Sequence, residues 1–197
     1  MGHPGDAEPH QRAGNLELNR RLQQELNPKS DDKREIKYMS VVFRENDKVM
    51  HIRNNYDIIW KKDDGEQGTG VFNGDIGVIE AIEHTTQTVR IRYEDRVAQY
   101  TFDMLGEIEH AYAVTVHKSQ GSEFDAVVLP LQDRPNRLYF RNLLYTAVTR
   151  AKKLLVVLGN PNTLAYMVHN HKKTLRYTGL KHFIHREMVN LQHERLS

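Results

Sequence analysis

The sequence predicts a three-layer α/β domain accompanied by a small β-barrel or meander. Short β-type runs at hairpin spacing follow one another between residues 75 and 102. Two apolar runs, Ala126–Leu131 and Leu154–Leu158, have the composition of buried parallel strands. A helical pattern separates these two runs, which is the order of a right-handed β-α-β crossover.

The composition is that of one globular domain, with room for a small insertion. The 197 residues are 39% hydrophobic and 27% charged. No apolar run approaches the ~18 residues of a membrane span, and no signal-peptide core follows Met1. With no cysteine, disulfides and thiolate metal sites are excluded, so we expect a cytoplasmic, nucleoid-associated protein without a membrane partner. A net charge of +2 is too small to indicate a nucleic-acid binder by itself.

The N-terminal quarter predicts a leader, a helix and a loop. Residues 1–13 are polar and aperiodic, as in a flexible leader or a cloning remnant. Asn15–Asn27 has an amphipathic helical pattern that Pro28 stops. The apolar positions of this helix are Leu16, Leu22 and Leu26, with Leu18 beside them. Residues 29–38 are predicted to form a charged loop.

Short strands are predicted through the middle of the chain. They are Val41–Phe43, Lys48–Arg53, Asp75–Ile82, Thr88–Tyr93 and Val97–Phe102. Thr88–Tyr93 alternates, with Val89, Ile91 and Tyr93 on one face. Tyr56–Gly70 is polar and rich in glycine, and we expect a loop there.

The last part of the chain predicts strands alternating with helices. Ala111–Val116 is expected to be a strand, followed by a turn at Lys118–Gln120. Leu138–Ala151 and Thr163–Asn170 have helical patterns on either side of the strand Leu154–Leu158. We expect residues 176–197 to form a terminal helix or tail.

Polar side chains gather where the strand Ala111–Val116 is expected to end. They are Thr115, His117, Lys118, Ser119 and Gln120. Ligands of open α/β sheets bind at this end of the strands, and such groups suit phosphate oxygens. Gly121 permits a tight turn, and Glu123 offers a carboxylate to ribose hydroxyls. The alternative is a polar transition that caps a helix.

Arg150 ends an apolar helical stripe and precedes a buried strand, so its charge needs a partner. A carboxylate would make a structural ion pair, whereas a phosphate would make Arg150 an arginine finger. Lys152 and Lys153 are explained by the helix dipole alone.

Several segments, in order, resemble the RecD branch of the superfamily 1 helicases. Thr115–Asp125 and Leu144–Ala151 are similar to motifs V and VI of that family. Upstream, Leu18–Pro28, Asp47–Tyr56 and Val71–Gly77 match its second motor domain. The resemblance covers residue 14 to the C-terminus.

The resemblance implies a RecA-like three-layer fold of the P-loop NTPase type, without a Walker A loop and with an inserted SH3-like barrel. It divides the motor domain into residues 14–70 and 108–175, around a barrel at residues 71–107. The implied activity is that of an ATP-dependent DNA helicase moving 5′ to 3′ in recombination or repair.

The resemblance also implies roles for single residues. Arg150 would be the catalytic arginine finger, with Gly121 and Glu123 near the nucleotide. The implied contacts to single-stranded DNA come from Thr115, His117, Lys118, Gln120, Arg53, Asn55 and Asn73.

No phosphate-binding Gly-x-x-x-x-Gly-Lys-Ser/Thr loop occurs in the sequence. ATP and Mg²⁺ would therefore be held mainly by an N-terminal motor domain of the same parent protein. We expect the chain alone not to hydrolyse ATP, and we interpret the polar leader as the mark of an artificial truncation.

Alternatives remain open. The barrel could be a non-enzymatic module that binds nucleic acid or protein, and a conjugative relaxase would share the helicase motifs. The aromatic residues Trp60, Tyr56 and Phe72 could stack on bases or pack into a core. The histidine pairs His169/His171 and His182/His185 lack further ligands, so we expect no metal site.

Overall fold

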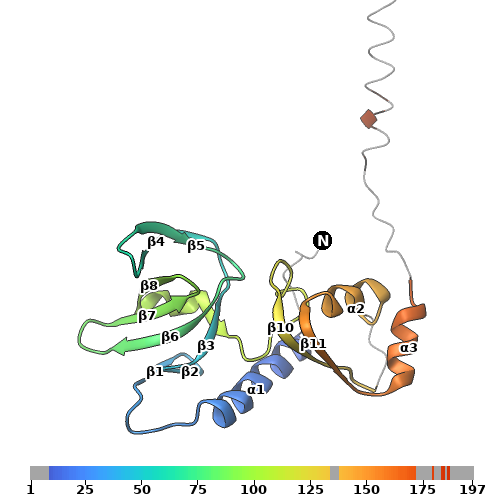
Figure 1. The fold of residues 1–197 in the computed structure, drawn as a ribbon, viewed down its shortest axis with the longest axis horizontal. Helices are drawn as coiled ribbons and strands as arrows, with labels where there is room; N and C mark the ends of the chain where they lie inside the picture. The colour runs from blue at the N-terminus through green and yellow to red at the C-terminus, as the bar shows by residue number, and fades with distance from the viewer. Residues whose placement is uncertain (1–8, 134–137, 172–178, 180–182, 185, 187–197) are drawn as a thin grey trace, which may run out of the picture. The chain divides into compact units, whose positions relative to one another are not determined.

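The computed structural model describes residues 9–133, 138–171, 179, 183, 184 and 186 (Figure 1). Two compact units divide the chain, one formed by residues 1–129 and 145–157, the other by residues 130–144 and 158–197. Among the described residues, no helix is long and apolar enough to cross a membrane.

The first helix, α1 (Pro9–Leu26), begins earlier than its leucine pattern predicts. Pro9 suits a first helical position, so residues 9–13, expected in the leader, belong to the helix. The buried stripe is also not the expected one. Asn19, Gln23 and Asn27 are buried, whereas Leu16 and Leu26 are 55% and 68% exposed. The amides at this four-residue spacing share one face and bond to the rest of the first unit, which the leucines cannot do.

A seven-stranded antiparallel sheet, in the order β5-β4-β8-β7-β6-β3-β9, dominates the first unit (Figure 1). Its strands are β3 (Lys48–His51), β4 (Asn55–Lys62), β5 (Gln67–Val71), β6 (Ile76–Glu83), β7 (Thr88–Tyr93), β8 (Arg96–Thr101) and β9 (Ile108–His110). Register shifts interrupt the β4–β5 and β6–β7 pairs, and such bulges bend a sheet. The short 3₁₀ helix η1 (Phe102–Glu107) joins β8 to β9.

The inner face of this sheet carries the core. Val89, Ile91 and Tyr93 of β7 are buried, which confirms the predicted alternation. Phe43, Tyr100 and Leu105 pack in the same cluster. A separate hairpin, β1 (Glu35–Tyr38) with β2 (Val41–Arg44), lies beside it, with Ile36 and Tyr38 against the core. Part of the loop expected at residues 29–38 is therefore a strand.

The segment Tyr56–Gly70 is a hairpin, so the loop predicted there is wrong. Its polar residues lie on the outer face, while Ile58 and Val71 enter the core. The Trp60 ring covers Gly68 on the paired strand, where an added Cβ would overlap it. The barrel expected at residues 71–107 is consequently too narrow, because β3, β4 and β5 belong to the same sheet.

The strand predicted at Ala111–Val116 is absent. The backbone of Ala113 bonds to the Asn19 amide in both directions, at 2.8 and 3.0 Å, and Ala111 N–H donates to Lys48 O at 2.8 Å. Because the Asn19 side chain satisfies both backbone groups of Ala113, the segment passes through the first unit without forming a strand.

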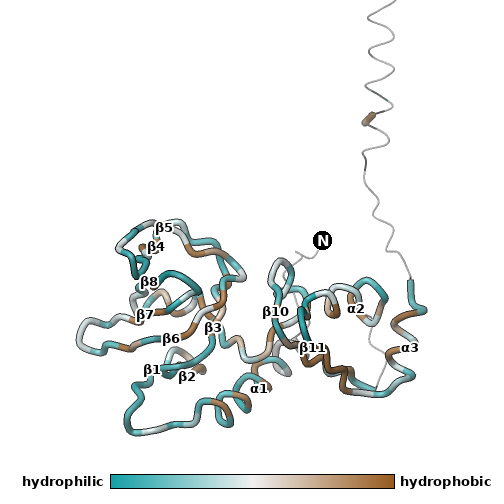
Figure 2. The backbone as a smooth tube through the Cα atoms, in the orientation of Figure 1, coloured by the Kyte–Doolittle hydropathy of each residue, from teal (hydrophilic) through white to brown (hydrophobic). Residues whose placement is uncertain are grey.

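Strands β10 (Phe124–Pro130) and β11 (Ala151–Leu158) pair with each other. The amides of Phe124 and Leu131 donate to Arg150 O and Leu158 O at 2.8 and 2.7 Å, so the strands are parallel. The predicted deep burial of these strands is wrong: Val128 is 61% exposed and Leu154 is 55% exposed. The apolar run of β11 stands out in Figure 2. The described residues supply no third strand to this sheet.

Two helices accompany these strands. The helix α2 (Arg141–Val148) is shorter than the predicted Leu138–Ala151, because Ala151 already begins β11. The helix α3 (Pro161–His169) confirms the prediction, with the Asn160 side chain accepting from Asn162 N at its start. The predicted tail at residues 176–197 lies almost entirely outside the described residues.

Replacing two glycines by alanine is expected to change the free energy of unfolding in opposite directions. A Cβ at Gly77 would lie 2.7 Å from Arg92 O and 2.8 Å from Ile91 Cγ2, so Gly77→Ala should cost about 1–3 kcal/mol by overpacking. Gly14 in α1 has open space, and Gly14→Ala should stabilise by up to ~1 kcal/mol. Urea unfolding followed by Trp60 fluorescence measures both. Equal effects would contradict the β6–β7 packing described here.

Candidate nucleic-acid interface

Residues 115–122, the motif V turns, form a run of short turns in the first unit. Ser119 N–H donates to Thr115 O at 3.0 Å, and Ser122 N–H donates to Ser119 O at 3.1 Å. The Thr115 hydroxyl accepts from Lys118 N at 3.3 Å. Ser119 is buried, whereas His117 and Gln120 are exposed. These turns leave several of the expected contact residues accessible on one short stretch.

Two residues expected near the nucleotide follow. Gly121 has φ +89°, and a Cβ there would meet nothing within 4 Å, so backbone conformation accounts for this glycine. The Glu123 carboxylate is exposed and lies 3.5 Å from Lys152 Nζ.

Lys118 already has a partner in the first unit. Its ammonium lies 2.5 Å from Glu109 Oε2, and both side chains are 37% exposed. Glu109 pairs with Met50 in the β3–β9 ladder. A half-exposed pair of this kind is worth only about 0–1 kcal/mol, so a phosphate can displace Glu109 at small cost.

A second group of expected contact residues lies at one edge of the barrel. We call residues 52–55 and 72–75 the barrel loops. Asn73 N–H donates to Asn54 Oδ1 at 3.0 Å, and Gly74 N–H donates to His51 O at 2.9 Å. The structure therefore brings Asn73 close to the segment of Arg53 and Asn55, which lies well before it in the sequence.

Aromatic rings flank the barrel loops. Tyr56 and Phe72 form an edge-to-face pair with centroids 5.6 Å apart, and they are 67% and 40% exposed. Exposed rings of this kind can stack on bases. Trp60 instead lies against Gly68, with Lys62 and Arg96 over its ring, so it is largely a packing residue.

Carboxylates on one short stretch touch both groups. Glu107 Oε2 accepts from Asn55 Nδ2 at 2.8 Å, and Glu109 pairs with Lys118. Glu107 and Glu109 stand two residues apart, on either side of the buried Ile108. The barrel loops and the motif V turns are thus linked through the same strand end.

Arg150 is partly buried and bonds to neutral groups. Its guanidinium donates to Ser122 O at 2.9 Å, to Thr146 O at 3.2 Å and to Thr149 Oγ1 at 3.3 Å. Among the described residues it makes no ion pair with a carboxylate. It therefore joins the motif V turns to the end of α2 while its charge stays uncompensated.

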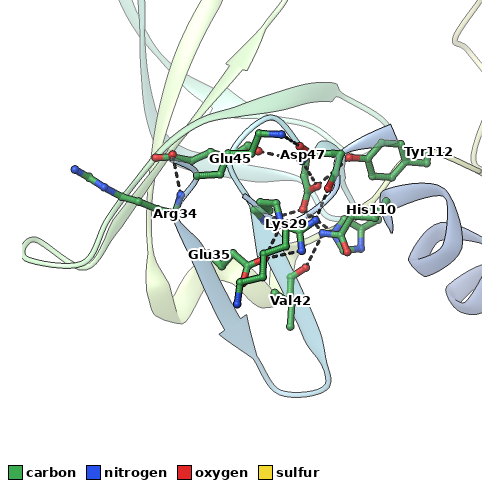
Figure 3. Close-up of polar contacts among 12 residues, drawn as sticks. Lys29, Arg34, Glu35, Val42, Glu45, Asp47, His110 and Tyr112 are labelled. Carbon is green, nitrogen blue, oxygen red and sulfur yellow. Dashed lines mark hydrogen bonds and ion pairs between the residues drawn. The ribbon is translucent and has the colours of Figure 1, made fainter. Parts of the chain in front are cut away.

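The first unit also contains a buried carboxylate, Asp47, at 0% exposure (Figure 3). Five donors converge on it, and we call this group the Asp47 cluster. The donors are Gln23 Nε2 at 2.6 Å, Asn27 Nδ2 at 2.8 Å, Arg44 N at 2.7 Å, His110 Nε2 at 3.0 Å and Tyr112 OH at 2.8 Å. The cluster ties α1, the start of β3 and the chain that leads to the motif V turns to one point.

The hydrogen bonds and the charge around Asp47 favour its ionised form. Burial by itself would raise the pKa of Asp47, but the hydrogen bonds from His110, Asn27 and Tyr112 and the charge of His110 outweigh it, so the pKa is lowered. Burial and the nearby Asp47 charge raise the pKa of the Tyr112 hydroxyl, which stays a donor.

Sequence reasoning missed this cluster. The four-residue spacing of Asn19, Gln23 and Asn27 was the available signal, because amides recurring at that interval share one helix face. Of the histidine pairs, His169 and His171 bond to backbone carbonyls, while His182 and His185 lie outside the described residues. No group of three metal-ligating side chains occurs within the described part of the chain.

Family models match two stretches of the chain. Residues 18–93 match the SH3 domain of ATP-dependent RecD-like DNA helicases, and residues 110–158 match the UvrD-like helicase C-terminal domain. The two stretches are thus similar to an SH3 domain and a C-terminal domain of helicases, and the predicted fold class is confirmed. The first match also includes β3, β4 and β5 in the SH3 domain.

Two curated proteins are similar in sequence to part of the chain. An uncharacterized protein of Methanocaldococcus jannaschii is 39% identical over 57% of the chain and 10% of its own length. The RecBCD enzyme subunit RecD of Mycobacterium tuberculosis is 35% identical over 59% of the chain and 20% of its own. These matches confirm the resemblance to RecD-like superfamily 1 helicases. The chain spans only a tenth to a fifth of these two relatives.

Comparison with solved structures finds a weak similarity to a helicase structure. The unliganded Pif1 of Bacteroides sp. aligns with 79% of the chain and 42% of its own, at a TM-score of 0.41 and 15% identity. A TM-score this low does not establish a common fold.

The lowered pKa of Asp47 makes stability depend on pH. A carboxylate whose folded pKa lies below its unfolded value of about 3.9 stabilises the fold above that value and loses the contribution as the pH falls further. We expect the free energy of unfolding to fall below about pH 4, and Asp47→Asn to flatten this fall while costing ~1–3 kcal/mol at neutral pH. Urea titrations at a series of pH values measure the free energy of unfolding, and Asp125→Asn, at an exposed carboxylate, is the control. An unchanged profile in Asp47→Asn would show that Asp47 does not carry the effect.

Proposed function

We propose that this chain is the C-terminal motor region of an ATP-dependent DNA helicase of the RecD-like family, moving 5′ to 3′ in recombination or repair. One observation supports it most strongly. The barrel loops and the motif V turns, matched by two separate helicase models, are joined through Glu107 and Glu109 in one unit.

The DNA contacts follow from the chemistry of the two groups. Arg53 and Lys118 offer cations to phosphates, and the exposed amides of Asn73 and Gln120 offer neutral donors. Tyr56 and Phe72 offer rings on which bases can stack without sequence preference. Such a surface binds single strands weakly and with strong salt dependence.

The nucleotide contacts fall to Arg150, Gly121 and Glu123. A guanidinium held only by neutral acceptors, within the described residues, fits a phosphate, and the exposed Glu123 carboxylate fits a ribose. The rest of the site, including the Mg²⁺ ligands, would come from the N-terminal motor domain of the parent protein. Bound ATP supplies the phosphoryl-transfer energy; the part of this chain is to hold the γ-phosphate charge with Arg150. The chain alone should not hydrolyse ATP.

Salt titration of single-strand binding tests the DNA contacts directly. Lys118→Ala should weaken the affinity of the chain for oligo-dT and reduce the slope of log K against log salt by about 0.7, the value for one phosphate on a single strand. Lys153→Ala is the matched control, since Lys153 is also exposed and paired with a carboxylate, Asp125. Equal slopes for the two variants would exclude Lys118 from the interface.

The role of Arg150 is tested in the complete protein. Arg150→Ala should lower ATP turnover by ~10³-fold or more while leaving single-strand affinity unchanged. The planar guanidinium of Arg150 is proposed to stabilise the phosphoryl group that is being transferred, and not the DNA. Arg150→Lys should also be impaired, since an ammonium cannot reproduce the planar fork. Exposed Arg141→Ala, at the start of α2, is the control. Turnover like the unchanged enzyme in Arg150→Ala would refute the assignment.

A further inference from the structure

The path of the chain between the barrel and the motif V turns is held by individual hydrogen bonds, most of them involving side chains, rather than by a strand. After β9, the segment 111–116 makes no strand, so the position of the motif V turns depends on individual hydrogen bonds. Three of its anchors are Ala111 N to Lys48 O, Tyr112 OH to Asp47 Oδ1, and the reciprocal pair between Ala113 and Asn19.

One of these anchors, the Tyr112 hydroxyl, bonds to Asp47, where donors from other elements also converge. Asp47 precedes β3, the strand that leads into the barrel loops at His51. It accepts from His110 and Tyr112 on the way to the motif V turns (Figure 3). It also accepts from Gln23 of α1 and from Asn27, the residue that follows α1. A displacement of the segment 110–113 would break bonds to a buried charge, which is expensive in a low-dielectric interior.

The composition of the cluster favours a role in placement over one in stability alone. Apolar residues of similar volume often stabilise a core as well as a buried ionic cluster does, so stability alone does not account for the cluster. Directional bonds to a single carboxylate impose a register between the three elements. The outer neighbours Glu45 and Arg44 extend the constraint, since Asn27 donates to Glu45 O and Arg44 donates to Asn27 O.

We propose that the Asp47 cluster positions the motif V turns relative to the barrel loops, so that both grip one single strand as a single site, with Tyr112 and His110 as positioning residues. This inference rests on the proposed function. Two contact groups fixed in one frame bind a strand long enough to reach both with a high effective concentration. If the frame loosens, a long strand loses that advantage and a short strand does not.

The test compares two oligonucleotide lengths with the 197-residue chain. Oligo-dT of about 4 nucleotides reaches one contact group, and about 12 nucleotides is in the range that spans a small binding domain. Tyr112→Phe removes one hydroxyl from Asp47. Tyr93→Phe is the matched control, because its buried hydroxyl bonds to Tyr100 at 2.7 Å inside the barrel.

Tyr112→Phe should lose about tenfold in affinity for the long oligonucleotide and little for the short one, whereas Tyr93→Phe should keep the ratio of the unchanged chain. A loss of fold stability alone would not change that ratio. An unchanged ratio in Tyr112→Phe overturns the inference and leaves the proposed function standing. Failure of the unchanged chain to bind either length removes the proposed function and this inference with it.

Amide hydrogen exchange gives a second readout that needs no ligand. Exchange at Ser119 and Ser122, whose amides close the motif V turns, should quicken in Tyr112→Phe and stay unchanged in Tyr93→Phe. Equal exchange at these amides in the two variants would show that Tyr112 does not hold the turns, and would overturn the inference.

Discussion

One constraint organises the first unit: a carboxylate without solvent contact must find its hydrogen bonds inside the protein. Asp47 is fully buried and takes donors from α1, from the last residue of β2, from the last residue of β9 and from Tyr112 beyond it. Leaving any of these donors out would strand a buried polar group at a cost of about 1–3 kcal/mol. The elements are therefore held together by satisfaction of one charge as well as by apolar packing.

That constraint explains the unusual face that α1 buries. A helix normally turns its leucines inward, because burying apolar area is favourable. The amides of Asn19 and Gln23 in α1, and of Asn27 just after it, point inward, since each one satisfies a carboxylate or a backbone group that apolar side chains would leave unpaired. The leucines are left largely exposed on the remaining surface of the helix.

The sequence predicted the features that arise from local pattern. The alternation in β7 and the helical pattern of Thr163–Asn170 need only neighbouring residues, and the structure has both. The ordered helicase motifs likewise predicted the two domains that the family models match. Polar hairpin β4–β5 was missed because its burial depends on Ile58 and Val71, and on a partner strand, β8, distant in sequence.

In the candidate site, too, features of the local sequence could be predicted, whereas contacts between distant residues could not. Residue types at the motif V turns could be predicted from sequence, because a threonine, a lysine and glycines in order indicate turns and phosphate contacts. The interactions that hold these turns could not be predicted from sequence. Glu109 pairs with Lys118, and His110 and Tyr112 bond to Asp47, only because the fold places these residues side by side. Whether the expected contact residues act as assigned stays a prediction.

The contacts of Arg150 are compatible with the catalytic role proposed for it as well as with a structural one. A carboxylate partner would neutralise the guanidinium and hold it at a strength that an incoming phosphate must overcome. Carbonyl acceptors at Ser122 and Thr146 orient the planar fork but leave its full positive charge. Because hydrogen bonds to neutral oxygens are weaker than those to an anion, a phosphate that approaches can replace them with a net gain. Under the proposed function, the bonds that connect residues 115–122 to the end of α2 would then be exchanged for bonds to the nucleotide, and occupancy of the nucleotide site would be coupled to the turns proposed to contact DNA.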